Sequence, residues 1–143
     1  MNKLPEVETA KALMMEAMDW SVMKWLREKK RVRAAADKAN DALDGLNQEI
    51  KLNWPETLRS EYQSLSAKAA QISNSSGDNA ILRKIKEGDD EARRARADAE
   101  ETFDEAEAQL STRLAREGCR KAIVSWELHE KAIAAAEALI RSN

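Results

Sequence analysis

Residues 22–50 read VMKWLREKKRVRAAADKANDALDGLNQEI, a stretch without proline in which apolar side chains recur every three or four residues. An average spacing of 3.5 residues lines these side chains along one seam of a helix, as in a left-handed coiled coil. The alternation also extends upstream to residue 15. The seam positions are Met15, Met18, Val22, Trp25, Val32, Ala36, Ala39, Leu43, Leu46 and Ile50. We therefore predict one long helix over residues 6–52.

The composition of the chain and the residues that follow this first helix also indicate a helical protein. The chain has 143 residues, of which 35% are charged, with four glycines and two prolines, a usage typical of long helices. Asn53-Trp54-Pro55 should end the first helix, because proline disfavours helical geometry in the residue before it. A second helix is expected over residues 56–72, ahead of the loop-forming sequence SNSSG.

Two glycines in the rest of the chain lie in different sequence contexts, and we expect a helix break at only one of them. Lysines precede Gly88 and three acidic residues follow it, which suits one helix ending there and another beginning. Gly118 is followed by basic residues, the wrong sign for a helix start, so a helix should run through it. We predict helices over residues 79–87 and 89–141.

These four helices predict an all-α fold within a single domain, residues 1–143. The two long helices should form an elongated antiparallel helical hairpin or coiled coil. The two short helices follow one another between them, so they can make a four-helix bundle only at one end. The other end would then be a two-helix stalk.

The stalk sequence carries more apolar residues than one seam needs. Residues 13–26 and the last helix are apolar on several sides, and such a helix must be buried on more than one face. Because one neighbour within the chain cannot cover them, we expect two chains to pair as a homodimer. The residues predicted to carry this self-association are Met15, Met18, Trp20, Met23, Trp126 and Ile133.

The segment WLREKKRVR at residues 25–33 is strongly basic. The heptad assignment puts Lys24, Arg27, Lys30 and Arg31 on the outer face, where they could be a solvated surface or an anion-binding or nucleic-acid-binding patch. The formal net charge of −2 supplies no overall attraction to nucleic acid, and no aromatic residues interleave for base stacking. In an antiparallel hairpin the acidic tract at residues 98–107 could instead approach these cations.

Catalytic and metal-binding patterns are not recognisable in the sequence. The only cysteine, Cys119, and the only histidine, His129, stand ten residues apart on one predicted helix, about 15 Å at 1.5 Å per residue. A di-metal bundle would need two Glu-x-x-His motifs, and no glycine-rich phosphate loop occurs. We assign no catalytic, cofactor-binding or metal residue, although a bundle enzyme with an unassigned carboxylate site remains an alternative.

The sequence therefore favours a non-enzymatic helical interaction or scaffolding protein that self-associates, with a further protein partner possible. The opening residues MNKLPEVETA contain no apolar signal region, and one cysteine cannot form an internal disulfide. A cytoplasmic protein with no membrane attachment is the expectation.

Overall fold

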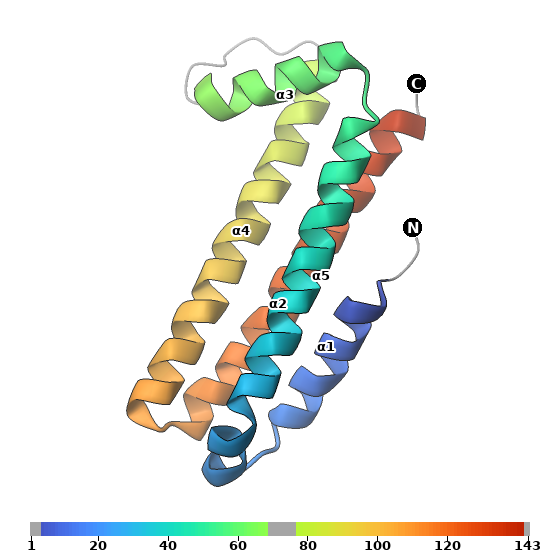
Figure 1. The fold of residues 1–143 in the computed structure, drawn as a ribbon. Coiled ribbons are helices and arrows are strands. Elements are labelled where there is room, and N and C mark those ends of the chain that lie inside the picture. Colours follow the sequence, from blue (N-terminus) through green and yellow to red (C-terminus); the bar gives the residue numbers. More distant parts are fainter. Residues whose placement is uncertain (1–3, 69–76, 142–143) are drawn as a thin grey trace.

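The computed structural model describes residues 4–68 and 77–141, and within these ranges it contains five α-helices and no strand (Figure 1). The helices are α1 (Pro5–Ala17), α2 (Val22–Leu52), α3 (Glu56–Lys68), α4 (Gly77–Gln109) and α5 (Thr112–Arg141). The predicted all-α fold is confirmed.

The long helices run alternately up and down, and α3 crosses the end of the bundle (Figure 1). Helices α4 and α5 pack closely along their length as a hairpin, α2 packs on α5, and α1 lies against both α2 and α5. Helix α3 packs on α4. Helices α2 and α4 run side by side with little close backbone contact, so side chains have to bridge them.

The predicted helix over residues 6–52 is wrong, because the chain breaks between Ala17 and Val22. Ser21 adopts an extended conformation and its hydroxyl accepts a hydrogen bond from the backbone N–H of Lys24 at 3.2 Å, which makes it an N-cap. The three- and four-residue spacing of apolar side chains continues through this turn, so the sequence pattern does not reveal it. Arg116 Nε of α5 donates to the carbonyl of Met18 at 2.8 Å and holds the turn against the bundle.

The predicted break at Gly88 is also wrong, since α4 continues from Gly77 to Gln109. The chain turns instead at Leu110, whose φ of 51° is left-handed, and at Ser111, whose hydroxyl caps α5 by accepting from the Leu114 N–H. The helix predicted over 89–141 is therefore two helices. The break at residues 53–55 and the passage of a helix through Gly118 are confirmed, whereas residues 69–72 of the predicted second helix lie outside the described residues.

Aromatic side chains from several helices fill the core. Trp25 of α2 stacks on Phe103 of α4, with ring centroids 5.6 Å apart. Trp126 of α5 is 1% exposed, and its indole N–H donates to Asn40 Oδ1 of α2 at 2.9 Å. These side-chain contacts therefore join α2, α4 and α5 in the region where the backbones of α2 and α4 are not in close contact.

The two glycines Gly118 and Gly45 give a matched test of this core. A Cβ at Gly118 would lie 2.8 Å from Phe103 Cδ1, so Gly118→Ala must displace the ring that stacks on Trp25. We expect an overpacking cost of about 1–3 kcal/mol, which outweighs the gain in helix propensity. A Cβ at Gly45 meets nothing within 4 Å, so Gly45→Ala should gain up to about 1 kcal/mol. Urea unfolding measures both, and equal stabilisation by the two substitutions would contradict the packing at Phe103.

Candidate functional site

Three of the residues predicted for self-association lie in the core. Trp20, Trp126 and Ile133 are 8%, 1% and 0% exposed within a single chain. The expectation that these three side chains line a surface is therefore wrong. The physical reason is α1, which folds back along α2 and α5 and supplies within the chain the cover that we assigned to a second copy. An ion pair of 2.6 Å between Lys11 and Glu130 joins α1 to α5.

The methionines of the same predicted group reach the surface. Met15 and Met23 are 60% and 66% exposed on the two helices that flank the α1–α2 turn, and Met18 within the turn is partly buried. Self-association through these residues stays a prediction.

The basic residues at the start of α2 are exposed as predicted, but two of them are already engaged. Arg31 pairs with Glu28 at 3.0 Å and with Glu16 at 3.8 Å, and both Lys24 and Arg31 lie over the Trp20 ring. Arg27 and Lys30 form no ion pair with any residue that the structure describes. Of the four residues of the possible anion-binding face, only Arg31 is therefore paired with carboxylates, while Lys24 is held over an aromatic ring.

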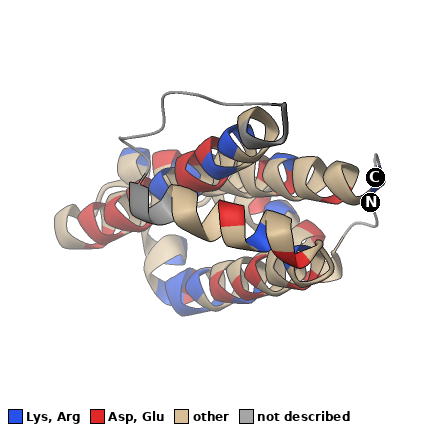
Figure 2. Cartoon of the chain, turned by 90° about the horizontal axis from the view of Figure 1, so that it is seen from above, with Lys and Arg blue, Asp and Glu red and all other residues tan. Residues whose placement is uncertain are grey.

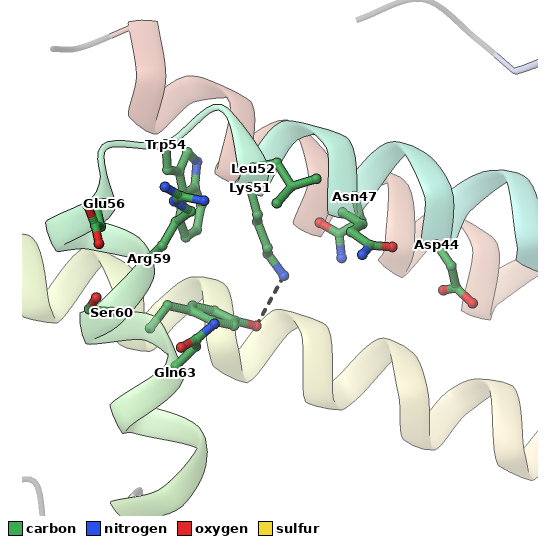
Figure 3. Close-up of a pocket in the computed structure, with 11 residues that line it drawn as sticks. Asp44, Asn47, Lys51, Leu52, Trp54, Glu56, Arg59, Ser60 and Gln63 are labelled. Carbon is green, nitrogen blue, oxygen red and sulfur yellow. Dashed lines mark hydrogen bonds between the residues drawn. The ribbon is translucent and has the colours of Figure 1, made fainter.

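A cleft of about 540 Å³ lies where α2 turns into α3 (Figure 3). This volume is within the range of small-molecule sites, about 300–1,000 Å³. Figure 3 shows its side chains reaching in from both helices, with Lys51 extending from α2 toward α3. The lining residues are Asp44, Asn47, Gln48, Lys51, Leu52, Trp54, Glu56, Arg59, Ser60, Tyr62 and Gln63. None of these was singled out from the sequence as a functional residue.

The inner wall of the cleft is built on a buried carboxylate. Asp89 of α4 is 3% exposed and accepts hydrogen bonds from the Lys51 ammonium, the Tyr62 hydroxyl and, at 3.3 Å, the Asn47 amide. Lys51 also donates to the Tyr62 hydroxyl at 3.2 Å. Burial, together with the hydrogen bond to Asp89 and its negative charge, raises the pKa of Tyr62, so the phenol keeps its proton and acts as a donor. This cluster fixes α2, α3 and α4 relative to one another.

Two polar groups of the cleft are enclosed without a partner among the described residues. They are the Nε of Arg59 and the Oδ1 of Asn47. The orientation of the Asn47 amide is fixed, because its Nδ2 donates to the Asp89 carboxylate, which can only accept. Arg59 and Asn47 both line the cleft, and each therefore carries one buried polar atom whose hydrogen-bonding capacity is unused.

A second polar network lies further along α2. Arg96 of α4 makes two hydrogen bonds of 3.0 and 2.8 Å to the Asp44 carboxylate, and its Nη2 lies 3.0 Å from His129 Nε2. Burial opposes the shift, but the hydrogen bonds and charge of Arg96 hold the pKa of Asp44 below its ordinary value. Burial and the Arg96 cation lower the pKa of His129, so its Nε2 accepts from Arg96 and the ring is neutral.

The remaining chemically reactive candidate is Cys119, which is completely buried. Burial raises the pKa of its thiol to about 12, so the reactive thiolate is scarce at neutral pH. Over residues 4–68 and 77–141, no three His, Cys, Asp or Glu side chains gather as a metal would require. No helix in these ranges is both long and apolar enough to cross a bilayer.

Neutral His129 predicts a specific dependence of stability on pH. The unfolded chain binds a proton to this imidazole near its ordinary pKa of about 6.5, while the folded chain resists it until lower pH. The free energy of unfolding should therefore fall as the pH drops below about 6.5. In His129→Gln, urea unfolding at about pH 7.5 and about pH 5.5 should show a smaller fall than in the wild type. An identical fall in both proteins would contradict the neutral, buried imidazole.

No protein-family model, curated protein or solved structure matches this chain. The α2–α3 cleft combines ligand-sized volume, apolar walls and unused hydrogen-bonding groups, which makes it the candidate functional site.

Proposed function

We propose that this chain is a non-enzymatic binding module whose α2–α3 cleft takes a small ligand that joins an anionic group to an apolar body. The single observation that carries the proposal is the Arg59 guanidinium, which lines the cleft with an enclosed and unpartnered Nε. A buried donor without an acceptor costs about 1–3 kcal/mol, and more when it is charged. A ligand oxyanion beside the Arg59 guanidinium would supply the opposite charge that this cation lacks.

The other charges around the cleft support an anion at Arg59. Lys51 is neutralised by Asp89, and Asp44 is neutralised by Arg96. Glu56 lies one helical turn from Arg59 but is exposed to solvent, and no ion pair joins the two. Arg59 is therefore the cation of the cleft that has no carboxylate of its own among the described residues.

The other residues that line the cleft indicate the chemistry of the rest of the ligand. Leu52, Trp54 and Tyr62 supply apolar and aromatic wall. The Trp54 indole is held in place because its N–H donates to the carbonyl of Ala136 at 3.0 Å and its ring meets Tyr62 edge to face. Asn47 Oδ1 favours a ligand that carries a hydrogen-bond donor at the end away from Arg59. A phenol or amine joined to a carboxylate by a short apolar chain has this chemistry.

Binding is favoured over catalysis by the state of the side chains. Tyr62 holds its proton, Lys51 is committed to Asp89 and Tyr62, and the Cys119 thiol is buried. A general base or nucleophile has to be free to exchange a proton or attack. The cleft offers fixed donors and charge, which suit recognition.

The proposal predicts charge-selective binding that depends on Arg59. With 3-(4-hydroxyphenyl)propionate as the probe, the ¹H–¹⁵N spectrum should show shifts of the Trp54 indole and of the Arg59 side chain. The matched amide, which has the same ring and chain but no charge, should give weaker shifts. Arg59→Gln should weaken binding of the carboxylate about 10-fold to 150-fold, the range for one charge-assisted hydrogen bond of about 1.5–3 kcal/mol.

Arg94→Gln is the control, because Arg94 is exposed on α4 outside the cleft. It removes the same charge and should leave the affinity unchanged. Equal affinity for the carboxylate and the amide, or equal loss in the two variants, would contradict the role of Arg59. Absence of any shift at millimolar probe would contradict a cleft for this class of ligand.

A further inference from the structure

Charged side chains of both signs are interspersed over the helices, as the view from the α3 end shows (Figure 2). The formal net charge of the whole chain is only −2, so the charge that a ligand meets in the α2–α3 cleft is decided by the ion pairs around it. Among the described residues, two such pairs involve side chains that line the cleft, Asp44 with Arg96 and Lys51 with Asp89. The second pair is the more deeply buried, since the side chains of Lys51 and Asp89 are 20% and 3% exposed.

The Asp89 carboxylate uses both of its oxygens on residues of the cleft wall. Its Oδ1 accepts a hydrogen bond from the Asn47 amide at 3.3 Å, and its Oδ2 accepts from the Lys51 ammonium and the Tyr62 hydroxyl. These three donors line the cleft, whereas Asp89 lies behind them and is not part of the lining. A ligand therefore cannot reach Asp89, which acts on it only through the side chains that it holds.

This arrangement leaves the cleft with one effective positive charge. Lys51 is the second cation of the lining, but its ammonium is bound to Asp89 and donates to the Tyr62 hydroxyl at 3.2 Å. Arg59 is the only lining cation that has no carboxylate partner among the residues that the structure describes. A ligand with one carboxylate can satisfy Arg59. A second carboxylate would lose its water of hydration and find no free cation in return.

The position of Lys51 indicates which end of a ligand feels this effect. Asn47 lies four residues before Lys51, so the two side chains share one face of α2. Figure 3 shows both reaching into the cleft from α2, while Arg59 reaches in from α3. A ligand whose carboxylate pairs with Arg59 therefore presents its other end to Asn47 and Lys51. In the wild type this end can be a neutral hydrogen-bond donor, but a second negative charge is disfavoured.

We propose that Asp89 is a positioning residue that sets the charge selectivity of the cleft. By binding the Lys51 ammonium, it makes the cleft select a monocarboxylate with a neutral polar group at its far end over the matching dicarboxylate. This inference rests on the proposed function of the cleft and narrows the class of ligand that it takes. It assigns a task to a buried carboxylate that no ligand touches.

Removing the two charges one at a time separates this role from a purely structural one. Asp89→Asn keeps the size of the side chain, and the new amide can still accept from Lys51 and Tyr62 and donate to Asn47 once the Asn47 amide turns over. Lys51 then becomes an uncompensated cation in the cleft. Lys51→Gln does the reverse and leaves the Asp89 carboxylate without its cation. The double variant Lys51→Gln with Asp89→Asn is neutral, as the wild-type pair is.

The probes are 3-(4-hydroxyphenyl)propionate and 3-(4-carboxyphenyl)propionate, which share a ring and a chain and differ by a hydroxyl or a second carboxylate. Their dissociation constants are obtained from the shift of the Trp54 indole in ¹H–¹⁵N spectra. The wild type should prefer the hydroxyl probe. Asp89→Asn should move the ratio of the two constants toward the dicarboxylate by about 10-fold, the worth of one charge-assisted hydrogen bond. Lys51→Gln should move the ratio the opposite way, and the double variant should restore it to within about two-fold.

Asp98→Asn is the matched control, since it removes a carboxylate that is paired with Lys121 at 3.1 Å on the same helix. Asp98 lies about 13 Å further along α4 than Asp89, at 1.5 Å per residue, and does not line the cleft. This variant should leave the ratio unchanged.

A ratio that stays at the wild-type value in Asp89→Asn and Lys51→Gln, while both probes bind more weakly, would mean that Asp89 only holds the helices together. That result would overturn the inference, although binding of the hydroxyl probe by the wild type would still support the cleft as a binding site. If Asp89→Asn does not fold, the opposite shift in Lys51→Gln and its reversal in the double variant decide the question. A wild type that binds neither probe would contradict the proposed function and this inference together.

Discussion

The turn between Ala17 and Val22 decides how the chain closes its core. It sends α1 back along the bundle, where α1 covers apolar surface of α2 and α5 that these helices cannot hide from each other. The Ser21 cap begins α2, and the contact of Arg116 with the Met18 carbonyl fastens the turn to α5. With α1 in place, one chain encloses its four tryptophans, each at 8% exposure or less.

Once α1 covers these apolar faces, polar side chains are left to bridge α2 and α4. We call this row of polar side chains the polar seam. These two helices are bridged by side chains, and each bridge satisfies a group that would otherwise be buried at a cost. Arg33 of α2 pairs with Asp104 of α4, and Arg96 of α4 joins Asp44 of α2 to His129 of α5. The seam ends at the cleft under α3. Most charged groups along the seam have a partner of opposite charge, so a group without a partner indicates where a ligand could bind.

The sequence predicts the helices well where local chemistry dominates. Asn53-Trp54-Pro55 ends a helix because of backbone sterics, and the charges after Gly118 are unsuitable for a helix start. The predicted break at Gly88 was wrong because Asp89, the acidic residue after it, is the buried partner of Lys51 and not a helix cap. Ser21 and Leu110 were missed because apolar spacing continues through the first turn, and the second depends on a left-handed residue that is not glycine.

The candidate site could not be predicted in the same way. Lys51, Tyr62 and Asp89 come from three different helices, so their meeting depends on how α3 crosses the end of the bundle. No spacing within one helix encodes that contact. The buried positions of Trp20 and Trp126 likewise depend on where α1 packs, which a seam pattern read as one long helix could not reveal.

A solitary chain hides its own tryptophans. Acrylamide quenching of tryptophan fluorescence, measured as the protein is diluted to well below any dimer dissociation constant, reports whether one chain is enough to cover them. We expect weak quenching that is the same at every concentration, because α1 supplies the cover within each subunit. Quenching that rises on dilution toward that of the urea-unfolded chain would show that a second chain provides the cover, and would contradict the fold-back of α1.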